Sequence, residues 1–126
     1  MSTTESEIAS FYANSVIFIT GASGFVGKVL VEKLLRSCPD ISRIYLLLRS
    51  KRGSTSEQRL AAFCESEIFD KLRSAGCPIG KKLVAVEGDI SQPKLGISDS
   101  QYDQLLEEVT IVFHSAASVR FDDPLK

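Results

Sequence analysis

The most constraining feature of this sequence is a loop with three glycines at intervals of three, Gly21, Gly24 and Gly27. Residues 16–19, just before it, are β-branched and aromatic, which predicts a strand buried on both faces. Glycines at this spacing permit a tight turn, a close approach of a ligand to the backbone, and close packing of the next segment on the strand. The loop therefore predicts a strand that turns sharply into a helix.

The residues after the loop have the period of an amphipathic helix. Val26, Leu30 and Leu34 recur every four residues with charged residues between them, and Pro39 predicts the end of the helix. Residues 44–48 form a second apolar run, typical of a strand in a parallel sheet covered by helices. Strand, loop, helix and strand thus follow the order of a βαβ unit that binds a dinucleotide pyrophosphate at the N-terminus of its helix.

Two other interpretations use the same glycines. A structural turn without a ligand is one, but strand, loop and helix stand in the order that the dinucleotide fingerprint requires. A nucleoside-triphosphate P-loop is suggested by Lys28, yet Ala22 stands where that motif needs glycine, and Val29 has no hydroxyl for magnesium. The predicted cofactor-binding residues of the loop are Thr20, Gly21, Ser23, Gly24, Phe25 and Gly27.

Capping signals mark two further helices. Thr55 and Gln58 fit a capping box at the start of a helix over residues 55–75. Ser98 and Gln101 mark the start of another helix, which precedes the last predicted strand.

Strands and helices alternate along the whole sequence, with a third strand predicted at residues 83–86 and a fourth at residues 110–113. We therefore expect an α/β fold, the first half of a Rossmann-like, doubly wound parallel sheet with about four strands and intervening helices. Residues 1–14 are expected to form a polar N-terminal segment. Residues 15–126 are expected to form the N-terminal part of a Rossmann domain that binds a dinucleotide.

Basic residues follow the second strand, where a site for NAD would place a carboxylate against the adenosine ribose. Asp40 lies near the right distance along the chain, but it precedes that strand. Arg49 stands at the required end and is followed by Lys51 and Arg52, whose charges suit the additional phosphate of NADPH. The sequence therefore predicts NADPH as the cofactor, with a solvated basic turn as the alternative interpretation.

The third strand is followed by Asp89 and Ile90. The carboxylate of Asp89 and the backbone of Ile90 are placed to flank the adenine at the carboxyl edge of the sheet. A carboxylate that caps its own turn is an equally good interpretation of Asp89.

His114 ends the fourth strand and leads into small residues, Ser115, Ala116 and Ala117. Since no second histidine or nearby cysteine accompanies it, His114 suits a structural hydrogen bond better than a metal site. The small residues would let the nicotinamide half of the cofactor run close to the backbone. His114 and these three residues complete the predicted cofactor site.

Composition argues against several other classes of protein. A net charge of -1 gives no broad electrostatic attraction to nucleic acid. Three cysteines without a C-x-x-C pair indicate neither a disulfide framework nor a zinc site, and they suit a reducing, intracellular compartment. The apolar runs are far too short to cross a bilayer. We therefore expect no metal, no nucleic-acid partner and no membrane span in this chain.

Together these segments resemble eukaryotic fatty acyl-CoA reductases, extended short-chain dehydrogenases/reductases with a male-sterility-type NAD-binding domain. The resemblance covers about residues 15–126 and is far more specific than the glycines alone. Besides the glycine loop, it rests on residues 34–39 (LLRSCP), 48–53 (LRSKRG), 68–70 (IFD), 88–90 (GDI), 95–96 (LG) and 114–121 (HSAASVRF).

The resemblance implies an NADPH-dependent enzyme that reduces long-chain fatty acyl-CoA to a primary fatty alcohol through an aldehyde. It further implies that the chain is the N-terminal part of such an enzyme, as a fragment or a short isoform. The full-length protein would then associate with the cytosolic side of the endoplasmic reticulum or peroxisome membrane. Two alternatives keep the fold: a related carboxylate or sterol reductase, and a dinucleotide-binding chain without catalysis.

The catalytic pair of the family is a tyrosine and a lysine four residues later, in which the phenol donates a proton to the carbonyl oxygen. The three tyrosines of this sequence are followed at that spacing by Val16, Arg49 and Leu106. We therefore predict that residues 1–126 alone reduce no acyl-CoA. The absorbance of reduced nicotinamide, followed with NADPH and a panel of acyl-CoA thioesters, tests this prediction, and turnover above a boiled control contradicts it.

Overall fold

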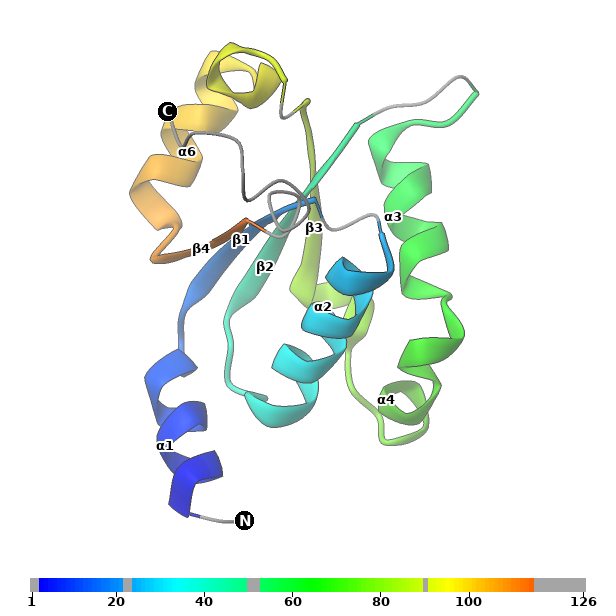
Figure 1. The fold of residues 1–126 in the computed structure, drawn as a ribbon, viewed down its shortest axis with the longest axis vertical. Helices are drawn as coiled ribbons and strands as arrows, with labels where there is room; N and C mark the ends of the chain where they lie inside the picture. Colours follow the sequence, from blue (N-terminus) through cyan, green and yellow to red (C-terminus); the bar gives the residue numbers. More distant parts are fainter. Residues whose placement is uncertain (1–2, 22–23, 50–52, 90, 115–126) are drawn as a thin grey trace, which may run out of the picture.

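The computed structural model of the protein describes residues 3–21, 24–49, 53–89 and 91–114. One parallel sheet is covered by helices (Figure 1). The strands are β1 (Val16–Thr20), β2 (Arg43–Leu48), β3 (Leu83–Glu87) and β4 (Ile111–His114). The α-helices are α1 (Thr3–Tyr12), α2 (Phe25–Ser37), α3 (Ser56–Cys64), α4 (Asp70–Ser74), α5 (Ile79–Lys82) and α6 (Asp99–Glu108), and the 3-10 helices are η1 (Glu67–Phe69) and η2 (Pro93–Gly96).

The strand order is β3-β2-β1-β4, and every neighbouring pair is parallel. The chain runs outward from β1 to β3 and then returns across the sheet to place β4 on the free side of β1. In register, Thr20 lies beside His114. The order of the strands reverses between β1 and β4, which is the position where doubly wound folds bind their ligands. The predicted α/β class and the first half of a doubly wound sheet are confirmed.

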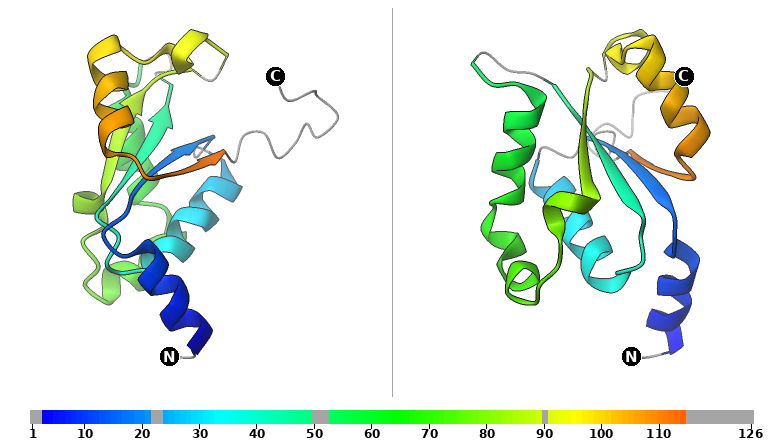
Figure 2. Two further views of the ribbon diagram at one scale, coloured as in Figure 1. Left: turned by 90° about the vertical axis from the view of Figure 1, so that its left-hand side faces the viewer. Right: turned by 180° about the vertical axis from the view of Figure 1, so that it is seen from behind.

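Helices lie on both faces of the sheet, with α2 and α3 on one face and α6 on the other (Figure 2). On α2 the buried side chains are those of Val31, Leu34 and Leu35, whereas Val26 is 59% exposed. The predicted stripe at every fourth residue is therefore wrong at its start. A step of four residues advances by about 40° around a helix, so such a stripe drifts away from the core.

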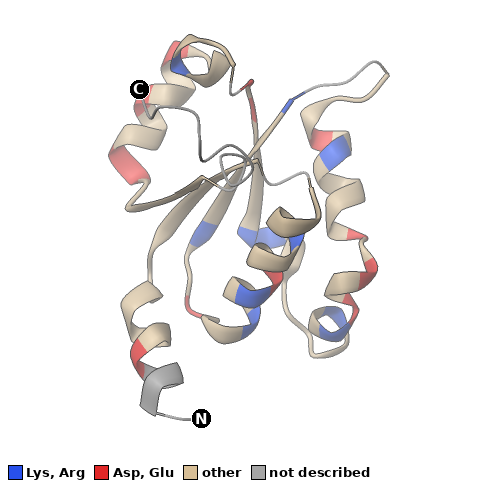
Figure 3. Ribbon diagram, viewed as in Figure 1, with Lys and Arg blue, Asp and Glu red and all other residues tan. Residues whose placement is uncertain are grey.

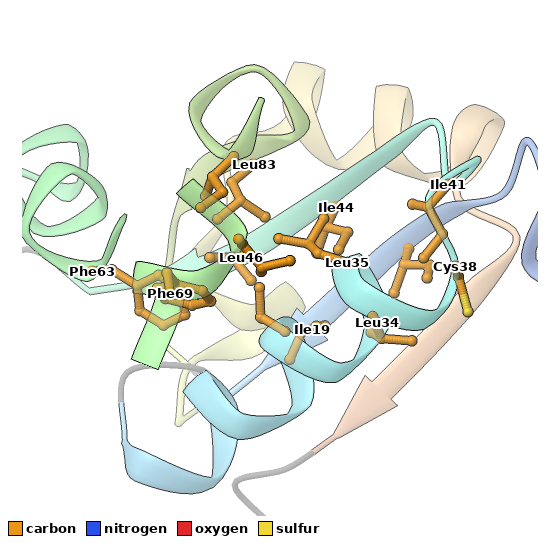
Figure 4. Close-up of a cluster of buried hydrophobic side chains, with 14 of the residues drawn as sticks. Ile19, Leu34, Leu35, Cys38, Ile41, Ile44, Leu46, Phe63, Phe69 and Leu83 are labelled. Carbon is orange, nitrogen blue, oxygen red and sulfur yellow. The ribbon is translucent and has the colours of Figure 1, made fainter. Parts of the chain in front are cut away.

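The larger core cluster joins the sheet to α2 and to the segment that contains Phe63 and Phe69 (Figure 4). Phe69 is fully buried, and the centroids of the two phenylalanine rings lie 5.5 Å apart. Strand side chains that complete this cluster include Ile17, Ile19, Ile44, Leu46 and Leu83.

One prediction about helices is wrong, because the single helix expected over residues 55–75 is broken into α3, η1 and α4. Part of the predicted polar segment 1–14 forms the helix α1. Ser66, with φ −57° and ψ 143°, leaves the helical conformation between α3 and η1. Phe63 and Phe69 are six residues apart and would lie about 120° from each other on a straight helix. The break lets both rings enter the same core.

Both predicted helix caps, at Thr55 and at Ser98, are confirmed. The Thr55 side chain accepts a hydrogen bond from the backbone N–H of Gln58, whose side chain accepts one in return from the backbone N–H of Thr55. Ser98 accepts a hydrogen bond from the backbone N–H of Gln101 at the start of α6. Both helices therefore begin where the sequence predicts.

The outer edge of β4 pairs with no other strand in the described part of the chain. Val112 in this strand is 61% exposed. An unpaired strand edge with an exposed apolar side chain is a template for intermolecular pairing. We expect residues 1–126 alone to self-associate in light scattering, and Val112→Lys to reduce the association, because a charge at an edge opposes pairing. A stable wild-type monomer at high concentration would contradict this expectation.

Candidate cofactor-binding site

The glycine loop begins at the carboxyl end of β1. Thr20 is the last residue of the strand and is buried, and Gly21 follows with φ +74°. This left-handed conformation is costly for residues with a Cβ, so the tight turn requires glycine here. Ser23 lies outside the described residues.

The N-terminus of α2 is open. Gly24 is its N-cap with no side-chain capping hydrogen bond, and a Cβ added at Gly24 would meet no atom of the described residues within 4 Å, its chain neighbours aside. The first N–H groups of a helix have no partner within the helix, and together with the helix dipole they favour a phosphate. Phe25 is exposed beside Gly24, whereas Gly27 is buried in the helix. These residues fit a pyrophosphate.

Arg49 and Asp89 meet at the carboxyl edge of the sheet. Arg49 directly follows β2, Asp89 lies two residues beyond β3, and the guanidinium Nη1 is 3.4 Å from the carboxylate Oδ2. The arginine side chain is 64% exposed. The two predicted site residues are thus brought together, while Lys51 and Ile90 lie outside the described residues. Their roles in cofactor binding stay predictions.

Asp89 also caps its own turn, as one of its two interpretations expected. Its Oδ1 accepts hydrogen bonds from the backbone N–H of Ser91 at 2.9 Å and from the Ser91 hydroxyl at 2.8 Å. These bonds, and then the Arg49 guanidinium, hold the pKa of the Asp89 carboxyl below its ordinary value. The carboxylate therefore stays ionised at neutral pH, and its stabilising contribution is lost only as the pH falls through this lowered pKa.

The residue before Asp89 holds the turn close to the sheet. A Cβ at Gly88 would overlap the backbone oxygen of Leu95 and the side chain of Leu47 in β2. Glycine is therefore needed for this close approach, which fixes where Asp89 leaves β3.

His114 forms a hydrogen bond between its ring Nδ1 and the hydroxyl of Thr20, across the β1–β4 pair. The structural hydrogen bond expected for this histidine is present, at the point where the strand order reverses. Ser115, Ala116 and Ala117 lie outside the described residues. The role of His114 and of these three residues beside the nicotinamide stays a prediction.

One pocket at this edge was not predicted. It has a volume of about 200 Å³ between α2, β2 and α3, and is lined by Lys28, Leu48, Arg59, Ala62 and Phe63. Lys28 belongs to the P-loop pattern, which this sequence does not match. Arg59 belongs to no sequence motif. The available signal was helical spacing, because Arg59 lies three and four residues before Ala62 and Phe63 on α3 and so shares their face.

Two other features are absent from the described residues. No group of three or more His, Cys, Asp or Glu side chains there is arranged to hold a metal ion. None of the helices in the described ranges combines the length and the apolar character needed to cross a membrane.

Comparisons with known proteins agree with this geometry. Residues 19–126 match the model of an NAD-binding family described as male sterility protein. The mouse protein named fatty acyl-CoA reductase 1 is 40% identical over 119 residues, and the human fatty acyl-CoA reductase 2 is 45% identical over 122 residues. These alignments cover 94% and 96% of this chain, but only 23% and 24% of the relatives. The chain thus spans about a quarter of the length of these curated relatives.

Two solved structures that are similar to this chain are reductase domains. The reductase domain of a non-ribosomal peptide synthetase from Mycobacterium tuberculosis superposes with a TM-score of 0.65 at 27% identity, over 95% of this chain and 29% of that one. The terminal R domain of the myxalamid pathway gives 0.59 at 35% identity, over 81% and 24%. The resemblance to fatty acyl-CoA reductases that the sequence predicts is confirmed, and the chain belongs to the male sterility protein family of NAD-binding domains.

Proposed function

We propose that this chain is the NADPH-binding part of an enzyme that reduces fatty acyl-CoA to fatty alcohol. The choice of NADPH rests on Arg49, which is exposed at the carboxyl end of β2, where an NAD site would have an acidic residue. The relatives named fatty acyl-CoA reductases support the choice of substrate.

Each part of the site has a separate task in this proposal. The N-terminus of α2, left open by Gly24, binds the pyrophosphate, and Arg49 pairs with the phosphate on the adenosine ribose. Asp89, held by Ser91, flanks the adenine. When bound, NADPH supplies a hydride. Two NADPH and two protons convert an acyl-CoA to an alcohol, with release of CoA and two NADP⁺, because the thioester is reduced first to an aldehyde and then to the alcohol.

The test uses the full-length protein that contains this segment, supplied with NADPH and with saturated acyl-CoA thioesters of increasing length. We expect oxidation of NADPH and formation of a primary alcohol, with two NADPH consumed per alcohol. A protein that binds NADPH but leaves every acyl-CoA unchanged would favour another reductase of the same fold, or a chain that binds dinucleotide without catalysis.

We further propose an intracellular location. The three cysteines, Cys38, Cys64 and Cys77, are free thiols, as suits a reducing compartment. Burial raises the pKa of all three, which keeps the thiols protonated and poorly reactive. The attachment of the full-length protein to the endoplasmic reticulum or peroxisome membrane is part of this proposal and rests on the family resemblance.

A further inference from the structure

Three consecutive residues of η2 have left-handed backbone conformations. Lys94 has φ +51°, Leu95 has φ +59° and Gly96 has φ +65°. Glycine adopts this conformation readily, but for lysine and leucine it is uncommon and has an energetic cost. Such strained residues persist only where the surrounding structure holds them, and they are concentrated at functional sites. The contacts of this left-handed turn therefore indicate what the strain maintains.

The turn contacts the backbone of Asp89, the residue that the proposed function places against the adenine. The Leu95 carbonyl oxygen accepts a hydrogen bond from the Asp89 N–H at 2.6 Å. The same oxygen lies so close to Gly88 that a Cβ there would overlap it. A Cβ added at Gly96 would lie 3.2 Å from the Asp89 nitrogen, closer than most Cβ atoms approach another atom. The left-handed turn thus fixes the position of the Asp89 backbone.

The turn is itself anchored to the rest of the fold. The Ile97 side chain is buried in the core between the sheet and α6, and the Leu95 side chain packs against that core. The Lys94 ammonium lies 5.5 Å from the centroid of the Tyr102 ring, which belongs to α6. These contacts hold the left-handed residues in place, so the turn can act as a rigid support for Asp89.

The Asp89 carboxylate is oriented by its own local contacts. Its Oδ1 accepts the two hydrogen bonds from Ser91, whereas its Oδ2 faces the exposed guanidinium of Arg49 at 3.4 Å. Acidic and basic segments accordingly lie near each other at the ends of β3 and β2 in Figure 3. An ionised carboxylate accepts hydrogen bonds and donates none. It therefore fits the amino group of adenine and repels the carbonyl oxygen that hypoxanthine has at the same position.

We propose that the left-handed turn of residues 94–96 is a positioning element that gives the cofactor site its preference for adenine. This inference rests on the proposed function, because the turn acts through Asp89. The turn holds the Asp89 backbone where the carboxylate accepts a hydrogen bond from the adenine amino group. The strain at Lys94 and Leu95 thus serves the specificity of binding rather than the stability of the fold.

Substitution of Gly96 tests the proposal, because Gly76 offers a matched control. Gly96→Ala and Gly76→Ala each place a Cβ on a backbone with positive φ, +65° and +85°, so both should lower the melting temperature. Only the Cβ at position 96 would press on Asp89. A Cβ at position 76 would meet no atom of the described residues within 4 Å, its chain neighbours aside.

The measurement is the affinity of the full-length protein for NADPH and for the analogue in which hypoxanthine replaces adenine, determined by titration calorimetry. We expect the wild-type protein and Gly76→Ala to bind NADPH about tenfold more tightly than the analogue, because the analogue lacks a charge-assisted hydrogen bond. In Gly96→Ala this ratio should fall to about twofold or less, since the displaced carboxylate no longer makes that bond. An unchanged ratio in Gly96→Ala would overturn the proposal.

Lys94 provides a second test if Gly96→Ala does not fold. Its side chain is 61% exposed, so Lys94→Val and Lys94→Asn remove the same side-chain contacts and differ mainly in their effect on the backbone. Valine is β-branched and tolerates the left-handed conformation poorly, whereas asparagine tolerates it well. Lys94→Val should therefore reduce the preference for adenine, and Lys94→Asn should keep it. Equal preferences in the two variants would contradict a role for the turn.

A double-mutant cycle shows whether the turn acts through Asp89. Asp89→Ala should abolish the preference for adenine, and adding Gly96→Ala should then leave the ratio of the two affinities unchanged. If Asp89→Ala kept the wild-type ratio, another group would be reading the adenine, and the proposal would fall.

Failure of the proposed function has a different result. A wild-type protein that binds neither NADPH nor NADH removes that function, and this inference with it. A wild-type protein that binds NADPH with a preference for adenine, which Gly96→Ala leaves intact, removes only the role of the turn.

Discussion

Replacement of Arg49 by alanine is expected to weaken NADPH binding roughly tenfold to a hundredfold and to leave NADH binding nearly unchanged. A charge-assisted hydrogen bond contributes about 1.5 to 3 kcal/mol, which corresponds to this range. Arg49 is exposed at the carboxyl end of β2, so its removal leaves no buried group without a partner. The loss should therefore fall on the cofactor that carries the extra phosphate. Dissociation constants for both cofactors, measured by titration calorimetry on the full-length protein, provide the measurement.

Gly24→Val is the contrasting variant. The Gly24 backbone has φ −87° and ψ 179°, which valine adopts without strain, and in the described part of the chain an added Cβ meets no atom within 4 Å besides its chain neighbours. The protein should therefore fold. The new side chain would occupy the space in which both cofactors place the pyrophosphate, so NADPH and NADH should weaken alike. If Arg49→Ala produced that same equal loss, Arg49 would be holding the fold or the pyrophosphate, and the preference for NADPH would lose its main support.

Phe69→Ala is expected to have the largest effect on stability. Phe69 is completely buried and packs on Phe63, so truncation removes apolar contacts and leaves a cavity. Such a change in a core costs about 3 to 5 kcal/mol, a large part of the stability of a typical domain. Urea unfolding followed by circular dichroism should show an earlier midpoint, or loss of the cooperative transition.

Phe11→Ala is the matched control, because this phenylalanine of α1 is 70% exposed. Its ring meets Tyr12 edge-on, so its truncation should lower the free energy of unfolding by about 1 kcal/mol or less, well below the effect of Phe69→Ala. A Phe69→Ala variant as stable as Phe11→Ala would mean that η1 is not part of the folded core.

The sheet and the glycine loop could be predicted from the sequence because their signals are local. Four short apolar runs mark the strands, and the three glycines mark one turn whose geometry requires φ above zero at Gly21. The capping box at Thr55 is equally local, since both hydrogen bonds span only three residues. Each of these features is stabilised mainly by residues close to it along the chain.

Features that depend on tertiary packing were missed. The helix breaks after α3 because the side chains of Phe63 and Phe69 pack in the same core. The spacing of apolar residues over 55–75 does not reveal this tertiary contact. The Arg59 side chain reaches the carboxyl edge of the sheet because α3 packs beside the end of β2. Asp89 illustrates the intermediate case. Its turn-capping bonds are local, but its contact with Arg49 joins residues 40 positions apart.

The strand order also has a consequence for how the protein folds during synthesis. β1 and β2 are joined by one helix and can pair early, whereas β4 joins β1 across 94 residues, the separation of Thr20 and His114. Closing so long a loop has an entropic cost that is repaid only after β4 has been made. A nascent chain therefore carries one side of its central strand unpaired while the ribosome adds the residues up to β4. During this interval a chaperone that covers apolar strands would improve the yield of folded protein.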